Sequence, residues 1–232
     1  ITGTYGGKDG IAFTGLSING DDGHIDVEVR NPGTITLEAE NIENNKKDYD
    51  YGVVEIEDDA DLHIYNSDAK SILKINSIGN MGFSGIRTNG GGQITVDGLI
   101  DVNNFDSGFS FATGDKSMVT IGGGKISNVN NLIDVDSEVT NARVNFDVKT
   151  DNKGNVTSVG SRYAMLEGDI NNQGTGSTFN IGLGTADSYW KGTAINSGDA
   201  LNLYMANGST WTNTGDSTVK SLTADKSYLV MS

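Results

Sequence analysis

The residues that could do acid–base chemistry are carboxylates, which gather in two short stretches of the chain. A polysaccharide lyase or hydrolase needs clustered carboxylates, with a Lys or Arg base in the lyase. The four arginines do not recur beside an acid at a repeat spacing, and Glu55 and Glu57 alternate with Val54 and Ile56 as on a solvated strand face. We therefore interpret the acids as surface groups and do not expect an enzyme. They are Glu55, Glu57, Asp58, Asp59, Asp61, Asp97 and Asp101.

Nucleophilic and metal chemistry have weaker support still. The chain has no Cys, and only His24 and His63 could act as the base of a catalytic triad. The strings nearest to a serine nucleophile motif are FDSGF and TGDST, and neither matches it. The calcium repeat G-G-x-G-x-D is broken in NGGGQITVDG, and the EF-hand loop pattern has no match. We expect no metal and no cofactor.

The stretch NNKKDYDYG, residues 44–52, is the candidate for ligand binding. Tyrosine supplies a large contact area at a low entropic cost, which suits a binding surface. The alternative interpretation is a plain solvated loop. The candidate ligand-binding residues are Lys46, Lys47, Asp48, Tyr49, Asp50 and Tyr51.

Aromatic residues offer a second route to binding, because sugar sites use aromatic platforms. Phe105, Phe109 and Phe111 could line a groove of this kind, but we favour the interpretation that they stack in the core. Trp190 and Trp211 have the same two interpretations, and Trp190 in DSYWKG could instead lie on the surface.

A repeat positions these residues. Ile94-Thr95-Val96 lies 25 residues before Val119-Thr120-Ile121, and Ile35-Thr36-Leu37 reads as an earlier copy. Each copy is a short strand with period-2 alternation, which cannot bury its inner side unless it stacks on another copy. The pattern predicts a right-handed parallel β-helix of roughly nine coils, with about 4.8 Å between coils. Its aligned strand positions are Leu62, Ile94, Val119, Val144, Phe179 and Leu201.

The spacing also predicts loops and side-chain ladders. The steps of 32 residues before Ile94 and 35 before Phe179 imply extruded loops, and the segment 146–159 carries a β-hairpin signal around DNKG. Asn103-Asn104 and Asn130-Asn131 predict an asparagine ladder between coils. The competing all-β folds are a β-sandwich and an up-and-down barrel. Either would give regularly spaced strands, but neither predicts that similar residues recur from one strand to the next.

Composition and charge limit the classes of partner. The 232 residues include 32 Gly and one Pro, and the formal charge is −15 with a pI near 4.3. This charge disfavours nucleic acid and anionic membrane surfaces as partners. No apolar run reaches the length of a membrane helix, about 18 residues or more. No stretch of ten residues has helical periodicity.

The segment 184–225 resembles passenger domains of type Va autotransporter adhesins of Gram-negative bacteria. The similarity rests on a strand with Leu201 and Leu203, on NGSTW at 207–211, and on Val219 with Leu222. GTITLEAENI and GQITVDGLIDV resemble other coils of that family. The resemblance covers about residues 33–229 and implies a secretion signal before the passenger and an outer-membrane barrel after it, both expected to be missing here.

From this resemblance we expect a single β-helix passenger over 1–232, with 1–32 less regular than 33–232. The implied function is that of a secreted or cell-surface adhesin, for attachment, biofilm formation or virulence. The expected partners are a host matrix protein, a glycan or a second copy, with membrane contact only through the missing barrel. The alternatives are a structural stalk that holds another domain, or a polysaccharide lyase or hydrolase.

Overall fold

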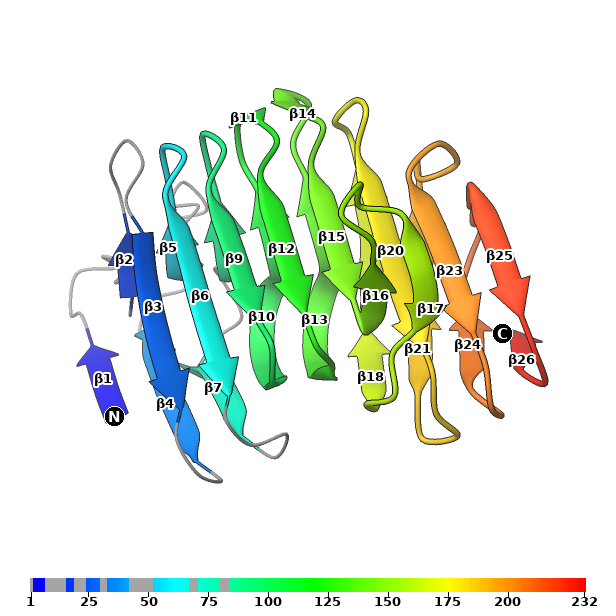
Figure 1. Ribbon diagram of the computed structural model, residues 1–232, viewed down its shortest axis with the longest axis horizontal. Helices are drawn as coiled ribbons and strands as arrows, with labels where there is room; N and C mark the ends of the chain where they lie inside the picture. Colours follow the sequence, from blue (N-terminus) through cyan, green and yellow to red (C-terminus); the bar gives the residue numbers. More distant parts are fainter. Residues whose placement is uncertain are drawn as a thin grey trace.

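The computed structural model describes residues 2–6, 16–18, 24–29, 33–41, 52–66, 71–79 and 84–232. All of its regular elements are β-strands, and nearly all of them pair in parallel with the coil before and the coil after (Figure 1). In Figure 1 the chain runs down the front and up the back while it advances from left to right, which makes the solenoid right-handed. No helix occurs in the described segments, so none there could span a membrane.

The front sheet contains one strand from each of eight successive coils. All its pairs are parallel, and every strand pairs with the strand one coil earlier or later. Its strands are β3 (His24–Val29), β6 (Asp61–Asn66), β9 (Gln93–Val96), β12 (Met118–Ile121), β15 (Arg143–Phe146), β20 (Thr178–Leu183), β23 (Leu201–Met205) and β25 (Ser221–Ala224).

The rear sheet is a path of nine strands, which agrees with the roughly nine coils predicted. Two of its strands are long because they continue round a corner into the third face of the coil. The rear strands are β1 (Thr2–Gly6), β4 (Thr34–Asn41), β7 (Ile72–Gly79), β10 (Leu99–Phe111), β13 (Gly124–Val135), β18 (Ala164–Glu167), β21 (Tyr189–Gly192), β24 (Thr210–Asn213) and β26 (Tyr228–Met231).

The third face is formed by the second halves of β10 and β13 together with shorter strands on either side. These are β2 (Leu16–Ile18), β5 (Gly52–Ile56), β8 (Ser84–Thr88), β19 (Asp169–Asn172) and β22 (Ala194–Ile195). One turn adds the small pair β11 (Gly114–Asp115) and β14 (Val139–Thr140). The only antiparallel pair among the described strands is the hairpin β16 (Val148–Thr150) and β17 (Val156–Val159).

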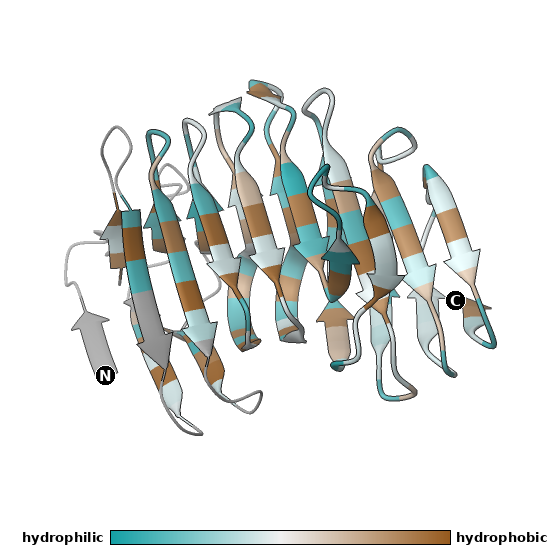
Figure 2. Cartoon of the chain, in the orientation of Figure 1, coloured by the Kyte–Doolittle hydropathy of each residue, from teal (hydrophilic) through white to brown (hydrophobic). Residues whose placement is uncertain are grey.

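The predicted front-sheet register is confirmed. Ile94 lies opposite both Leu62 and Val119, and the row continues through Val144 and Phe179. All five side chains are buried. Figure 2 shows the resulting alternation of apolar and polar bands along the front strands. The proposed early copy at Ile35 was placed on the wrong face, because Ile35 belongs to the rear strand β4 and pairs with Leu73.

The five aromatic side chains weighed as a possible sugar platform pack in the core. Phe105, Phe109 and Phe111 are completely buried, which confirms the favoured interpretation over a sugar platform. Trp190 is also buried and stacks on Trp211 of the next coil, with ring centroids 5.0 Å apart and an interplanar angle of 5°. A solenoid rather than a sandwich explains this stacking, since equivalent positions of parallel coils lie directly above one another.

The asparagine ladder was right in kind and wrong in register. Asn103 lies opposite Ser127, not Asn130, and its amide donates to Asn76 Oδ1 at 2.9 Å. Asn104 and Asn128 both have positive φ, 69° and 53°, at the corner between the rear sheet and the third face. Asparagine tolerates this conformation better than most residues. The repeated Asn therefore marks a corner as well as a ladder.

A longer amide ladder runs across the front sheet. The amide of Asn180 donates to Asn145 Oδ1 at 2.8 Å, the amide of Asn202 donates to Asn180 Oδ1 at 3.0 Å, and Ser221 continues the row at 2.8 Å. The hairpin β16–β17 contacts β20 on this face, and Asn145 and Asn180 are buried. Each amide is thus satisfied by its neighbour in place of water.

Candidate functional site: a polar groove on the rear sheet

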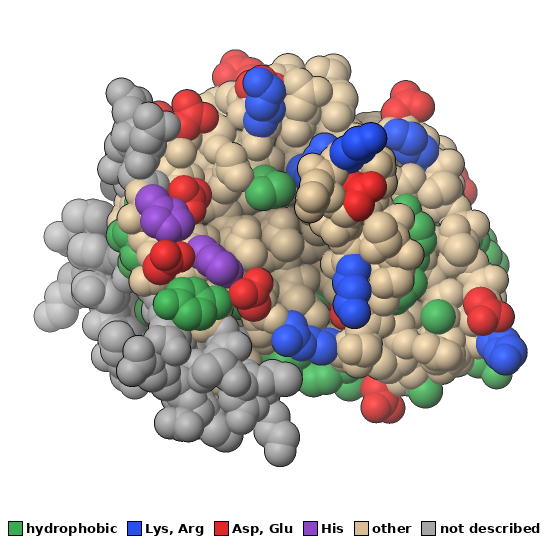
Figure 3. All heavy atoms as spheres, viewed as in Figure 1, with side chains coloured by type: hydrophobic (Ala, Val, Ile, Leu, Met, Phe, Trp, Pro, Cys, Tyr) green, Lys and Arg blue, Asp and Glu red, His purple; other side chains and the backbone are tan. Residues whose placement is uncertain are grey.

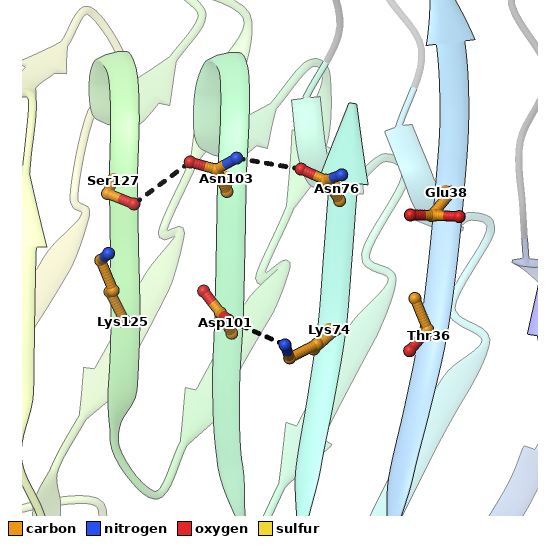
Figure 4. A pocket seen from close by; sticks show the side chains of 8 residues that line it. All are labelled: Thr36, Glu38, Lys74, Asn76, Asp101, Asn103, Lys125 and Ser127. Atoms are coloured by element: carbon orange, nitrogen blue, oxygen red, sulfur yellow. Dashed lines mark hydrogen bonds and ion pairs between the residues drawn. The ribbon is translucent and has the colours of Figure 1, made fainter. Parts of the chain in front are cut away.

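The predicted binding loop, Lys46 to Tyr51, lies outside the described residues. Within the described part of the chain, a shallow groove of about 500 Å³ lies on the outer face of the rear sheet. Two rows of side chains line it, and each row takes one residue from β4, β7, β10 and β13 (Figure 4). The first row is Thr36, Lys74, Asp101 and Lys125; the second is Glu38, Asn76, Asn103 and Ser127.

Strand alternation produces the two rows. In β7, Leu73 and Ile75 point into the core, so Lys74 and Asn76 must point outward. Asp101 and Asn103 do the same in β10, between the buried Ile100 and Val102. Parallel pairing then places Lys74 opposite Asp101 and Asn76 opposite Asn103, so equivalent side chains lie side by side along the solenoid axis.

The second row is held by hydrogen bonds between side chains. Asn103 donates to Asn76, and Asn103 Oδ1 accepts from Ser127 Oγ at 3.3 Å and from Asn128 Nδ2 at 2.7 Å. These contacts fix the Asn103 amide without burying it completely. The row therefore presents oriented amide groups along the floor of the groove (Figure 4).

The first row is held more loosely. Lys74 Nζ lies 3.7 Å from Asp101 Oδ2, and both side chains are partly exposed, so this ion pair contributes little to stability. Lys125 and Glu38 have no hydrogen bond or ion pair with any described residue. An ammonium and a carboxylate are thus available to a ligand within the same groove.

A second polar cluster lies on the front sheet, where two histidines alternate with carboxylates (Figure 3). Asp61 Oδ1 is 2.5 Å from His24 Nδ1, and Asp26 Oδ2 is 3.1 Å from His24 Nε2. His63 continues the chain, with Nδ1 3.5 Å from Asp26 Oδ1 and Nε2 3.0 Å from Asp97 Oδ2. The hydrogen bonds to Asp61 and then Asp26 raise the pKa of His24 above its ordinary value.

The cluster bridges its groups in pairs and does not converge them on one point. No group of three His, Asp or Glu side chains in the described segments is arranged to hold a metal ion. Among the described residues, the contacts of the two imidazoles are carboxylates and, for His63, the ring of Tyr65, and no described hydroxyl bonds to either imidazole. The cluster is therefore a surface network of paired imidazoles and carboxylates.

Arg162 connects this cluster to the base of the hairpin. Its guanidinium donates to the backbone oxygen of Asp97, and its backbone N–H donates to Asp147 Oδ1 at 3.3 Å. Asp147 is only 3 % exposed, and its Oδ2 has no hydrogen-bond partner. Burial raises the pKa of the Asp147 carboxyl to about 7, although Arg162 acts in the opposite direction.

One predicted surface acid is in fact buried. Glu55 is 4 % exposed and forms an ion pair with the guanidinium of Arg87, which lies opposite it on β8. The expectation of a solvated strand face is wrong at this position, because β5 is buried on both sides. An acid and an arginine do stack between coils here, as a structural pair.

The other candidate acids are dispersed over the solenoid. Asp58 and Asp59 form a turn with positive φ, Asp61 and Asp97 belong to the histidine cluster, and Asp101 lies in the groove. The structure therefore brings one member of each acidic stretch, Asp61 and Asp97, into the same cluster, where imidazoles and Asp26 link them. The sequence-based argument missed Lys74 and Lys125, although the strings LKIN, IDVN and GKIS carry the same pattern of charged, apolar and small polar residues.

Comparisons with protein-family models, with curated proteins and with solved structures found no match.

Proposed function

We propose that this chain is the binding part of a secreted or surface-displayed adhesin of the autotransporter type. In this proposal it attaches a cell to host matrix, to glycans or to another copy of itself. The observation that carries the proposal is the polar groove, in which eight outward side chains from four coils form two parallel rows. The resemblance of its coils to type Va passengers supports the cellular setting.

The groove is suited to binding by many individually weak contacts. Each coil repeats similar groups one strand spacing along the axis, about 4.8 Å. A ligand with its own repeat can therefore contact several coils at once, and the contacts gain from being linked. The core of each coil fixes the strands, and hydrogen bonds fix the second row, so little ordering of the backbone is needed on binding.

The test is an array of matrix proteins, glycans and the chain itself, probed with the wild-type chain and with a variant whose groove is disabled. Lys125→Met together with Asp101→Asn removes two charges and leaves the buried neighbours unchanged. Lys191→Met, on the same sheet at an exposed position beyond the groove, is the matched control. Saturable binding that the groove variant loses and the control keeps supports the proposal.

Binding that survives the groove variant would move the contact elsewhere, with the loop at 44–52 the first alternative to delete. If the chain binds to no spot of the array, including the spot that carries the chain itself, adhesion by this chain is contradicted. A structural stalk that holds another domain is then favoured. New reducing ends or new ultraviolet absorbance from a polysaccharide would instead indicate a hydrolase or a lyase.

A further inference from the structure

We propose that the ligand of the groove is an uncharged linear polysaccharide that lies along the solenoid axis, with one sugar ring over each coil. This inference rests on the proposed binding function and specifies its ligand. It is carried by the spacing, the charge balance and the chemistry of the eight groove residues.

The spacing of the rows fits an extended glycan. Neighbouring strands lie about 4.7–4.9 Å apart, and an extended pyranose chain advances by nearly the same length per ring. Register places Thr36, Lys74, Asp101 and Lys125 in one line across four strands. Because the two repeats are nearly equal, the mismatch that accumulates over four strands stays well below the length of one ring, and successive rings can meet successive members of this row.

The charges of the groove favour a neutral ligand. Lys74 and Lys125 are balanced by Glu38 and Asp101, so the groove has no net formal charge. The chain as a whole carries −15, which repels a polyanion at long range. A polycation would be attracted from a distance, but the groove itself would give it no net attraction, because two ammonium groups lie beside the two carboxylates.

The polar groups match hydroxyls better than peptide side chains. All eight lining residues carry hydrogen-bonding groups, and none is aromatic or aliphatic. A peptide could not add as a further strand, because β7 and β10 each have a partner on both sides. Asn76 keeps amide N–H donors and one lone pair of Oδ1 for a ligand, whereas Asn103 keeps one N–H donor, because its Oδ1 already accepts from Ser127 and Asn128.

The lack of an aromatic platform has a consequence for affinity. Each ring gains only hydrogen bonds, whose net worth is about 0.5–1.5 kcal/mol. Short oligosaccharides should therefore bind weakly, and affinity should rise with each added ring until roughly four rings span the four strands that line the groove. Longer chains should gain little more from this groove.

The experiment is calorimetric titration of the chain with neutral cello-, manno- and xylo-oligosaccharides of increasing length. Oligogalacturonate and heparin fragments serve as the charged probes. We expect one neutral series to bind with affinity that rises with length up to about four rings. We also expect little change between about 50 and 500 mM salt, because no charged ligand group is to be screened.

The variants separate this groove from other surfaces. Lys125→Met should weaken binding of the neutral series by about tenfold, the equivalent of one lost charge-assisted hydrogen bond. Lys191→Met should leave it unchanged. A stability curve for each variant shows that the fold is retained, since both lysines point away from the core.

The outcomes distinguish the two proposals. Binding only to charged glycans, with a steep salt dependence, overturns the neutral ligand, as does binding only to proteins or to a second copy; in each case the adhesive function stands. If the wild-type chain binds nothing on the array of matrix proteins, glycans and the chain itself, both the adhesive function and the neutral glycan ligand are overturned.

Discussion

Trp190 and Trp211 lie face to face in the solenoid core at equivalent positions of two successive coils. Each indole N–H donates to a glycine carbonyl on the preceding coil, Trp190 to Gly168 at 3.0 Å and Trp211 to Gly192 at 3.2 Å. One repeated residue thus fills the core, stacks on its copy and satisfies its only polar atom.

Truncation of this pair should cost a large part of the stability of the rod. We expect Trp190→Ala to lower the free energy of unfolding by about 3–5 kcal/mol, because it leaves a large cavity and an orphaned contact face on Trp211. Urea denaturation followed by circular dichroism measures this. Trp190→Phe is the control, and an equal loss in both variants would contradict the cavity explanation.

Asp147 should make the stability of the rod depend on pH. Its pKa is raised from 3.8 to about 7 in the folded state, so the folded protein holds a proton that the unfolded chain releases. This contribution to stability is complete below the unfolded pKa and is lost as the pH rises through about 7. Asp147→Asn should remove it.

The measurement is the unfolding midpoint of the wild-type chain and of Asp147→Asn between about pH 4 and pH 8. We expect the variant to be more stable than the wild type at pH 8, with the gap closing at about 1.4 kcal/mol per pH unit at most as the pH falls. Asp151→Asn, in the exposed tip of the hairpin, is the control. A gap that does not change with pH would refute the buried proton.

His24 should titrate above the ordinary range for histidine. Its imidazolium is stabilised by Asp61 and Asp26, so the folded state favours the charged form, and this effect disappears as the pH rises through the raised pKa. Asp61→Asn should move the pKa of His24 back toward its ordinary value. Nuclear magnetic resonance of the imidazole signals reads this directly, and Asp115→Asn, distant on a turn, should leave the signals unmoved.

Glu55 and Arg87 should be strongly coupled. Removal of one partner leaves the other charge buried, which typically costs about 3–5 kcal/mol. We expect Glu55→Gln and Arg87→Met each to destabilise the fold, and the double variant to lose clearly less than the sum. A double-mutant cycle by denaturation measures the coupling, and additive losses would show that the pair acts as two independent residues.

The front sheet could be predicted from the sequence because its strands are single, short and separated by turns. Leu62, Ile94, Val119 and Val144 recur with the same alternation, and the structure stacks them in that order. Ile35 was misplaced because the same apolar-Thr-apolar pattern occurs on both sheets. Local alternation states which side faces inward, but not which face of the coil a strand occupies.

The groove could not be found by the same route. It takes two residues from each of four coils, and its members are of different types, so no single motif marks it. The register error at Asn130 arose at the corner after Asn103, where Asn104 and Asn128 bend the chain with positive φ. A step of 24 residues aligns Asn103 with Ser127 and would have brought the groove rows together.

The hairpin β16–β17 leaves the coil after β15 and returns to it at β18, while Val144 and Phe179 remain in register on either side. The sequence leaves room for the hairpin to pack on the next coil. Gly160 directly follows β17, and a Cβ atom at Gly184 would lie 2.2 Å from the backbone oxygen of Gly160. Excursion length is thus independent of coil stacking. In evolution, duplication of one coil would lengthen the rod by about 4.8 Å. Insertion of a new hairpin between two strands would change the surface of the rod and leave its length the same. The two kinds of change are therefore independent.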